Sequence, residues 1–304
     1  MADSSSLNAS CGIDGALAFE EGPGGALFAS MESAGSRARV ALLGATVVSY
    51  VPAGGAETLF LARRASFRPG TAIRGGIPLC LPWFGPGPAG MPRHGFFRLL
   101  EWEVESGSRE GGAVSLTLSL RDSPESAMYW AYRFRATCKL TLGPSLRISV
   151  SLRNEDERPF ELSCAFHPYF RFTDLSAVEL PGLEGACYDD DLAGDPRGTG
   201  RLQEGPLRVD GPIDRPYALQ GPVDLVDRSA GRRLRVSGAA NESIVVWTPW
   251  SPAGRALPDL DPDEHRAFLC VEPAIVPPFS RRIGPGESFE AGMEIEAGRL
   301  SATR

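Results

Sequence analysis

Apolar and polar residues alternate with a period of two through the middle of the chain. Over residues 134–142 every even position is apolar, and every odd position carries arginine, threonine or lysine. The same alternation returns over residues 146–152, after a Gly-Pro-Ser turn. Because alternate side chains of an extended strand point to opposite faces, the two runs predict a β-hairpin. Residues 160–166, beyond a further turn, predict a third antiparallel strand.

Other segments repeat this pattern. Strands are expected at residues 38–51, 113–120, 223–228, 233–237, 243–248, 267–272 and 287–296. Helical signal is limited to turns near residues 124–130 and 261–266, and the glycine- and proline-rich stretch 181–216 predicts loops. The sequence therefore predicts an all-β fold, a large antiparallel sandwich. The pattern does not give the order of the strands.

Composition favours one large β domain. The 304 residues include 35 glycines and 26 prolines, which are spread along the chain as many short strands joined by turns require. We expect the polar residues 1–15 to form a flexible leader and residues 16–304 to form a single domain. The leader lacks the basic and apolar regions of a secretory signal. No apolar stretch reaches the length needed to cross a bilayer.

The net charge and the cysteine content indicate which partners and which cellular compartment to expect. A formal net charge of −7 disfavours binding to nucleic acid or to an anionic membrane. The six cysteines form no Cys-x-x-Cys pair, and several lie in apolar runs, which predicts reduced, buried thiols. We therefore expect a cytoplasmic, monomeric protein whose partner is a small molecule.

His167 is the first candidate for chemistry. It follows the strand at 160–166 on the face opposite to the apolar side chains, beside Ser163, Ala165 and Tyr169. Small residues next to a histidine and a tyrosine suit a shallow concave surface, and histidine changes charge near neutral pH. An ordinary surface histidine, or a buried one with satisfied hydrogen bonds, remains the alternative.

Glu272 is the second candidate. It ends the apolar run 267–272 and is followed by Pro273, which tends to terminate strand pairing. A carboxylate at the mouth of an apolar strand is partly desolvated, which raises its pKa and makes it a usable general base. A solvated glutamate at a strand end remains the alternative.

The loop of residues 74–98 is the third candidate. Arg74 and Arg98 bracket a glycine- and proline-rich stretch that contains Arg93 and His94. Glycine lets backbone approach a ligand closely, and arginine binds phosphate or carboxylate with paired donors. A structural loop with solvated arginines remains the alternative.

Several chemistries lack their sequence signatures. The chain has no His-x-His, His-Glu-x-x-His or Cys/His cluster, so we expect no metal site. It has no Gly-x-Ser-x-Gly motif, which disfavours a serine hydrolase, and no glycine-rich nucleotide-binding loop. His265 lies among acidic residues and is expected at the solvated surface.

Six stretches, taken in order, resemble a known family. They are "IRGGIPLCLPWFG", "HGFFR", "FHPYF", "GPIDRPY", "VVWTPW" and "CVEPA", and they lie between residues 73 and 274, within a match that spans about residues 25–295. Together they resemble the hexose-6-phosphate mutarotases, also called glucose-6-phosphate 1-epimerases, of the galactose mutarotase-like superfamily. The resemblance implies a large β-supersandwich, in agreement with the alternation described above.

The resemblance also implies roles for individual residues. His167 of "FHPYF" would be the general acid and Glu272 of "CVEPA" the general base of anomer exchange. His94 of "HGFFR" would hydrogen-bond the sugar near its anomeric centre, and Asp214 of "GPIDRPY" would hold a sugar hydroxyl. The resemblance implies a sugar phosphate as substrate and neither a metal nor an organic cofactor.

The phosphate end of the implied site includes two departures from the family. Arg74 and Arg98 match the arginines that would bind the 6-phosphate. Arg93 stands where the family often has glutamine or a small residue, and we expect it to add phosphate affinity. Phe97 stands where the family has alanine, and we expect it to narrow the pocket.

The sequence thus predicts an isomerase that interconverts the α and β anomers of glucose 6-phosphate or a related aldohexose 6-phosphate. One alternative is an aldose 1-epimerase for unphosphorylated sugars. Another is a non-catalytic sugar-phosphate-binding protein on the same fold. A retaining glycosidase would need two carboxylates about 5 Å apart, for which Asp214 and Glu272 are the candidates.

Overall fold

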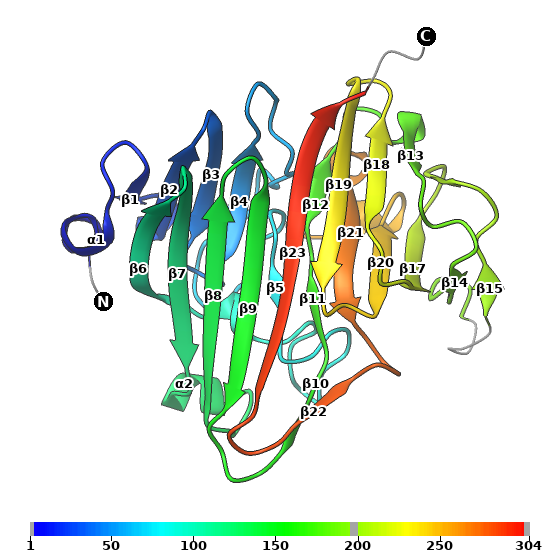
Figure 1. Ribbon diagram of the computed structural model, residues 1–304. Coiled ribbons are helices and arrows are strands. Elements are labelled where there is room, and N and C mark those ends of the chain that lie inside the picture. Colours follow the sequence, from blue (N-terminus) through cyan, green and yellow to red (C-terminus); the bar gives the residue numbers. More distant parts are fainter. Residues whose placement is uncertain (1–2, 195–199, 301–304) are drawn as a thin grey trace.

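The computed structural model describes residues 3–194 and 200–300 and consists mainly of antiparallel sheets (Figure 1). The largest, called here the front sheet, has nine strands in the order β16 (Leu207–Arg208), β13 (Val178–Leu180), β18 (Val223–Asp227), β19 (Arg232–Ala239), β23 (Ser288–Arg299), β9 (Leu146–Asn154), β8 (Phe134–Leu142), β7 (Ala113–Arg121) and β6 (Glu103–Glu110). The predicted all-β class is confirmed.

A second, eight-stranded sheet lies behind the first and is called here the back sheet (Figure 1). Its order is β15 (Arg201–Leu202), β14 (Cys187–Tyr188), β17 (Ile213–Ala218), β20 (Ser243–Thr248), β21 (Phe268–Ile275), β11 (Cys164–Phe166) and β5 (Leu79–Cys80), and β12 (Tyr169–Arg171) also pairs with β21. Apolar side chains from both sheets, such as Leu140 and Val271, share one core cluster.

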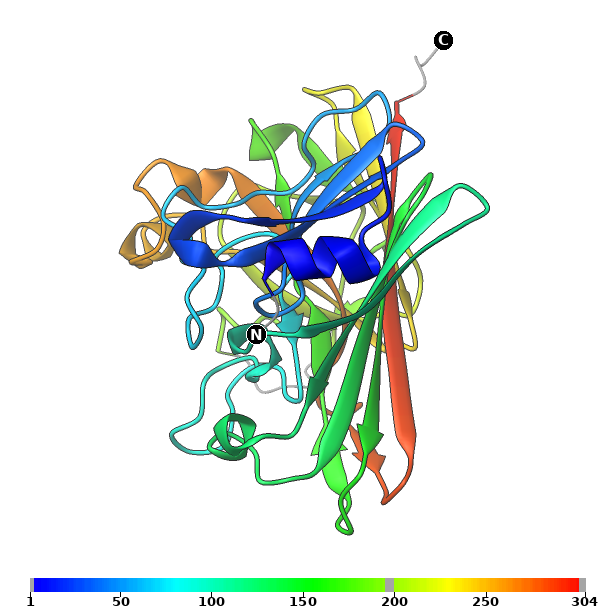
Figure 2. The ribbon, with the colours of Figure 1, turned by 90° about the vertical axis from the view of Figure 1, so that its left-hand side faces the viewer.

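Two smaller sheets complete the fold. The four-stranded sheet contains β1 (Leu17–Glu21), β2 (Leu27–Ser33), β3 (Ser36–Ala41) and β4 (Thr46–Val51), and β10 (Phe160–Leu162) pairs with β22 (Arg281–Ile283). Turning the molecule by 90° shows the four-stranded sheet and helix α1 (Ser4–Cys11) packed on the same side of the front sheet (Figure 2). Within the described part of the chain, no helix is both long and apolar enough to cross a membrane.

The alternation of apolar and polar residues in the sequence matches the alternation of buried and exposed positions in the front sheet. In β8 and β9 the apolar positions are buried while most polar positions between them are wholly or partly exposed, and Cys138 lies opposite Val150. The predicted hairpin is therefore confirmed. The expected strand at 38–51 is instead β3 and β4, because a turn interrupts it and its residues Gly44 and Ala45 have positive φ.

The N-terminal stretch has more structure than the predicted flexible leader over residues 1–15. Helix α1 is capped by Asp3, whose side chain accepts a hydrogen bond from the Ser6 N–H. Leu7 is buried in the main core, and the Asn8 amide bonds both the N–H and the carbonyl of Phe19. A side chain that satisfies strand backbone in this way ties the helix to β1.

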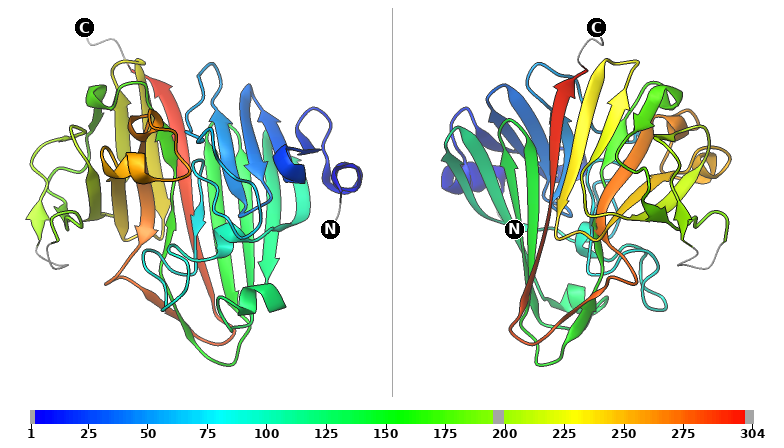
Figure 3. Two further views of the ribbon diagram at one scale, coloured as in Figure 1. Left: turned by 180° about the vertical axis from the view of Figure 1, so that it is seen from behind. Right: turned by 45° about the vertical axis from the view of Figure 1, so that its right-hand side comes forward.

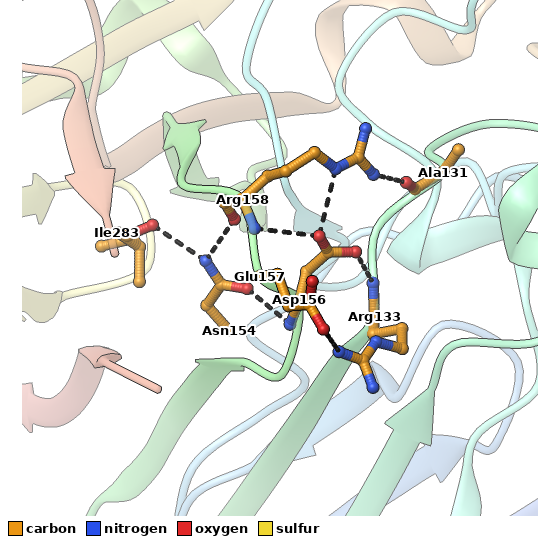
Figure 4. A network of polar contacts seen from close by, with 7 residues as sticks. All are labelled: Ala131, Arg133, Asn154, Asp156, Glu157, Arg158 and Ile283. Carbon is orange, nitrogen blue, oxygen red and sulfur yellow. Dashed lines mark hydrogen bonds and ion pairs between the residues drawn. The ribbon is translucent and has the colours of Figure 1, made fainter. Parts of the chain in front are cut away.

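A polar network fixes the turn between β9 and β10 (Figure 4). Asn154 is buried, and its amide nitrogen donates to the carbonyls of Arg158 at 2.9 Å and Ile283 at 3.0 Å. Asp156 accepts from the backbone N–H groups of Arg133 and Arg158. The turn therefore connects the front sheet to the β10–β22 pair. The predicted strand at 160–166 is interrupted at Ser163, which separates β10 from β11 in a different sheet.

Candidate active site

A cavity of about 960 Å³ opens on the face of the back sheet that points away from the front sheet. On β20 and β21 the side chains alternate, so that Val246 and Val271 pack in the core while Val245 and Glu272 line the cavity. The view from behind shows the loops before β5 and β21 lying over this face (Figure 3). All of the site residues predicted from the sequence line the cavity: Arg74, Arg93, His94, Arg98, His167, Asp214 and Glu272.

His167 and Glu272 meet at the base of the cavity. His167 Nε2 lies 3.4 Å from Glu272 Oε1, and their side chains are 8% and 1% exposed. His167 Nδ1 and Glu272 Oε2 are buried without a hydrogen-bond partner among the described residues. Both groups therefore have an unused polar atom for a ligand.

The sequence predicted that Glu272 ends its strand, and this prediction is wrong. It lies inside β21 opposite Val245, and β21 continues through Pro273 to Ile275. Pro273 falls where the neighbour of β21 on one side changes from β12 to β11, and such irregular points are where proline is tolerated in a sheet. The carboxylate is consequently fully buried rather than partly desolvated.

The electrostatics of the pair favour the neutral form of each group. Burial raises the pKa of Glu272 well above its ordinary value; Asp214 raises it further, and Arg98 opposes the shift. Burial also lowers the pKa of His167 well below its ordinary value, with contributions from His94, Arg98 and Arg74. Because neither group holds a charge easily, both are suited to pass a proton to or from a bound molecule.

His94 is held as a neutral hydrogen-bond donor. The Gly85 N–H donates to His94 Nδ1 at 3.3 Å, so the ring hydrogen resides on Nε2. Burial, followed by Arg98, Arg93 and Arg74, lowers the pKa of His94 to about 3. The ring lies edge-on to His167 with centroids 5.7 Å apart, so this donor stands beside the acid–base pair.

The backbone of this loop is held in an unusual conformation. His94 has a φ of 62°, in the left-handed region that few residues with a side chain adopt. At Gly95 any Cβ would lie 1.8 Å from the carbonyl oxygen of Leu81, so only glycine allows the loop to pass this close. The glycine after the histidine therefore places the His94 ring in the cavity.

The arginines differ in how far they are already engaged. Arg98 Nη2 donates to the carbonyl of Arg93 at 2.8 Å, but Arg98 Nε is buried without a partner. Arg93 is exposed at the rim. Arg74, by contrast, donates from Nε to Asp259 Oδ2 and from Nη1 to Tyr169 Oη, both at 3.0 Å.

Two expectations about other residues are wrong. Phe97 is fully buried and stacks on Phe134 with centroids 5.4 Å apart, so it packs in the core and does not line the cavity. His265 is also buried, with Nδ1 2.7 Å from the carbonyl oxygen of Pro262. Its neighbour Glu264 is buried as well, so the acidic residues around His265 do not place it at the surface.

The site also includes three residues that the sequence did not assign to it. Trp247, opposite Asp214 on β20, lines the cavity, as does Tyr169. Asp259 binds Arg74 from a segment 185 residues away. Tyr169 had a signal, because it lies two positions after His167 on the same face, whereas no local pattern indicates Asp259.

One group of side chains has the spacing of a metal site. Among the described residues, His167, Cys270 and Glu272 are the only three that bring such ligand atoms together, all within 4.8 Å of one another. Burial raises the pKa of the Cys270 thiol well above its ordinary value, and Glu272 adds to this, whereas metal binding needs the thiolate. In the metal-free protein the thiol of this set is therefore neutral.

Comparison with known proteins agrees with this geometry. The sequence profile of the family described as Aldose 1-epimerase matches residues 29–296. The chain belongs to this family. It is an isomerase of the mutarotase type, and the resemblance drawn from the six motifs is confirmed at the level of the family.

Curated relatives carry a more specific name. A protein of Cenchrus ciliaris is 32% identical over 271 residues, which is 86% of this chain and 81% of the relative. A protein of Escherichia coli strain K12 is 32% identical over 241 residues, which is 78% of this chain and 79% of the relative. Both are named "Putative glucose-6-phosphate 1-epimerase".

Solved structures share the fold. The crystal structure of a "putative mutarotase" from Salmonella typhimurium superimposes with a TM-score of 0.85 at 25% identity, covering 93% of this chain and 94% of that one. A galactose mutarotase-like protein from Clostridium acetobutylicum gives a TM-score of 0.76 at 14% identity, covering 93% and 98%. The predicted galactose mutarotase-like architecture is therefore confirmed.

Proposed function

We propose that the protein interconverts the α and β anomers of glucose 6-phosphate, or of a related aldohexose 6-phosphate. The observation that supports this most directly is the buried His167–Glu272 pair, 3.4 Å apart, in a cavity that is also lined by Arg93 and Arg98. The pair suits proton transfer at a sugar ring, and the arginines suit an anionic group on the same molecule.

The proposed reaction exchanges two protons with the sugar in each direction. Because both groups are neutral in the free site, the Glu272 proton first passes to His167 across the 3.4 Å between them, which gives a carboxylate and an imidazolium. Glu272 then takes the proton of the hydroxyl on C1 while His167 gives its proton to the ring oxygen. The bond between C1 and the ring oxygen breaks, and the C1–O1 bond becomes the aldehyde carbonyl. After rotation about C1–C2 the ring closes on the other face, with the protons returned by the same pair.

The pair begins and ends each cycle with the same number of protons, so no cofactor or metal takes part in the proposal. Each general acid or base contributes typically about 10²–10⁴-fold in rate. His94 would donate from Nε2 to a sugar oxygen near the anomeric centre. Asp214 would accept a hydrogen bond from a sugar hydroxyl.

Arg98 is the proposed principal ligand of the 6-phosphate, with Arg93 beside it at the rim. Its Nε is buried and has no hydrogen-bond partner among the described residues. A phosphate oxygen at this position would satisfy the group through a charge-assisted hydrogen bond. Because the phosphate is remote from C1, this contact is expected to act on binding more than on turnover.

The test follows anomer exchange by NMR exchange spectroscopy with glucose 6-phosphate and with free glucose. Losing one charge-assisted hydrogen bond corresponds to about 10–100-fold in affinity. Arg98→Met should therefore raise KM for glucose 6-phosphate by that factor and leave KM for glucose nearly unchanged. The control is Arg64→Met, which removes an exposed arginine outside the cavity. Equal effects on both sugars would argue against a phosphate site at Arg98.

An aldose 1-epimerase for unphosphorylated sugars is the second candidate, favoured by the description of the matching family. It predicts a higher kcat/KM for glucose than for glucose 6-phosphate in the same assay. A non-catalytic sugar-phosphate-binding protein would instead bind glucose 6-phosphate without accelerating the exchange of its anomers.

The compartment and the oligomeric state remain part of the proposal. All six cysteines are free, which fits a reducing compartment such as the cytoplasm. The proposed oligomeric state is a monomer.

A further inference from the structure

Tyr169 joins the candidate acid to the arginines of the cavity. Its ring lies face to face with the imidazole of His167, with centroids 4.8 Å apart and planes 10° apart. The phenol is buried, and the rings of Trp247 and Phe268 pack around it at 6.1 Å and 5.1 Å. The imidazole therefore has a flat, fixed wall on one side that restricts rotation of its ring.

The hydroxyl of Tyr169 is held in turn by Arg74. Arg74 Nη1 donates to Tyr169 Oη, and Arg74 Nε donates to Asp259 Oδ2, both over 3.0 Å. The bond to Asp259 is charge-assisted, a type roughly twice as strong as a neutral hydrogen bond. The orientation of this guanidinium is therefore set inside the protein, before any ligand arrives.

Arg98 provides the contrast within the same cavity. An arriving anion finds a buried, unpartnered N–H at Arg98, whereas at Arg74 it must compete with the carboxylate of Asp259. The charge of Arg74 is thus already balanced by an ion pair whose side chains are only 23% and 32% exposed. The two arginines match the same phosphate-binding pattern in the sequence, but the structure gives them different surroundings.

We propose that Asp259, Arg74 and Tyr169 form a positioning chain that sets the plane of the His167 ring, so that Arg74 serves the proton-transfer step rather than recognition of the phosphate. The proposal rests on the mutarotase function proposed above and revises the phosphate-binding role that the sequence resemblance gave to Arg74. A ring held parallel to Tyr169 keeps Nε2 at 3.4 Å from Glu272 Oε1. Losing the chain would let the ring turn away from this position.

The kinetic test compares Arg74→Met and Tyr169→Phe with the controls Arg64→Met and Tyr50→Phe. Tyr50→Phe removes a buried hydroxyl from the core outside the cavity. Misplacing a reacting group by about 1 Å can cost about 10²-fold in rate. We expect each test variant to lower kcat by tenfold or more on glucose 6-phosphate and on glucose alike, with KM changed less than kcat. A loss confined to KM for glucose 6-phosphate would overturn the proposal.

A double-mutant cycle tests whether the two residues act as one unit. If Arg74 acts through Tyr169, the Arg74→Met/Tyr169→Phe double variant is slower than the slower single variant by no more than about twofold, because coupled residues are not additive. If the fold loss of kcat in the double variant equals the product of the two single losses, the proposal is overturned.

A third measurement tests the positioning chain independently of which substrate the protein uses. The chain contains three histidines, so the imidazole signals of the free protein can be assigned with His167→Ala. Arg74→Met and Tyr169→Phe should shift the His167 ring signals, and the two controls should not. Unshifted signals would overturn the positioning chain whatever the substrate is. Failure of phosphate recognition would appear separately, in Arg98→Met.

Discussion

The front and back sheets use the same strand geometry for different purposes. Along β8 of the front sheet, buried apolar residues alternate with residues that are mostly exposed or half-buried. Along β21 of the back sheet all eight residues are buried, including a glutamate and a proline. β8 of the front sheet therefore has one buried face, whereas β21 is buried on both faces. The difference shows that the back sheet buries polar groups that serve chemistry and do not stabilise the fold.

The cost is visible in the polar atoms of the back sheet. Burying a polar group without a hydrogen bond opposes folding, yet Glu272 Oε2 and His167 Nδ1 are both buried and unpartnered. Along β8 the interior positions are apolar, and the one buried polar atom without a partner, Arg135 Nε, belongs to a side chain that also bonds Glu105 on the partly exposed face. Proton transfer benefits from such a buried acid–base pair, because both groups have perturbed pKa values and each keeps one atom without a hydrogen-bond partner.

The largest expected effect is on catalysis at the back sheet. Glu272→Gln keeps the size of the side chain but removes the base, so kcat for anomer exchange should fall by about 10²–10⁴-fold. The free energy of unfolding should not decrease, because the variant no longer buries an ionisable carboxyl group. NMR exchange spectroscopy and chemical denaturation measure the two quantities.

The matched control for this variant is Glu161→Gln, on the exposed side of β10. It should leave both kcat and stability unchanged. Retention of wild-type exchange in Glu272→Gln would show that this glutamate is not the base.

The next largest effect is on stability at the front sheet. Leu140→Ala removes a fully buried side chain of β8 and should cost about 2–5 kcal/mol of unfolding free energy. Its exposed neighbour Lys139 should tolerate alanine within about 0.5 kcal/mol. Folded Leu140→Ala protein should keep wild-type kcat. Denaturant titration combined with activity per folded molecule checks this, and a large loss of kcat would mean that the sheets do not divide their roles as described.

A smaller effect is expected where β9 leads into β10. Asn154→Ala removes two hydrogen bonds to carbonyl oxygens, which are then left without these donors (Figure 4). The expected loss is about 1–3 kcal/mol of unfolding free energy. Glu157→Ala in the same turn serves as control, because Glu157 is 94% exposed and 4.0 Å from its partner Arg133. Equal losses in the two variants would contradict the network.

The last effect is a slope and not a loss at one pH: the pH dependence of stability should change. The pKa of His94 is lowered from 6.5 to about 3, chiefly by burial. Below pH 6.5 the unfolded chain takes up a proton that folded His94 does not accept. The unfolding free energy therefore falls as the pH decreases through this window, by at most about 1.4 kcal/mol per pH unit for this group.

His94→Gln should accordingly have a shallower slope of unfolding free energy against pH between about pH 6.5 and 4. His167 contributes with the same sign and is retained in the variant, so part of the slope should persist. Denaturant titrations at several pH values measure the slopes. Parallel curves for the two proteins would contradict the neutral state of His94.

The same contrast explains what the sequence could predict. The runs at 134–142 and 146–152 predicted β8 and β9 closely, because a sheet with one buried face repeats its pattern at every second residue. Strands such as β14, β15 and β16 have two residues each and were not predicted. Such short strands are defined by pairing with distant segments, which leaves no periodicity to detect.

The candidate site followed a similar division. Its residues were found through motifs, and the cavity brings all of them together. The surroundings of individual residues, inside and outside the site, were not predicted: Glu272 lies within a strand, Phe97 packs in the core and His265 is buried. These properties depend on which segments fold against each residue. The bond from Arg74 to Asp259, across 185 positions, is the clearest example.

That separation also has a consequence for how the protein folds. Contacts between distant segments form late and slowly, because closing a long loop costs chain entropy before the contact stabilises anything. The hairpin of β8 and β9 can form locally, whereas the cavity requires segments near residues 74 and 259 to be in place together. During refolding, β-sheet circular dichroism should therefore recover before enzymatic activity, and activity should report the last step of assembly.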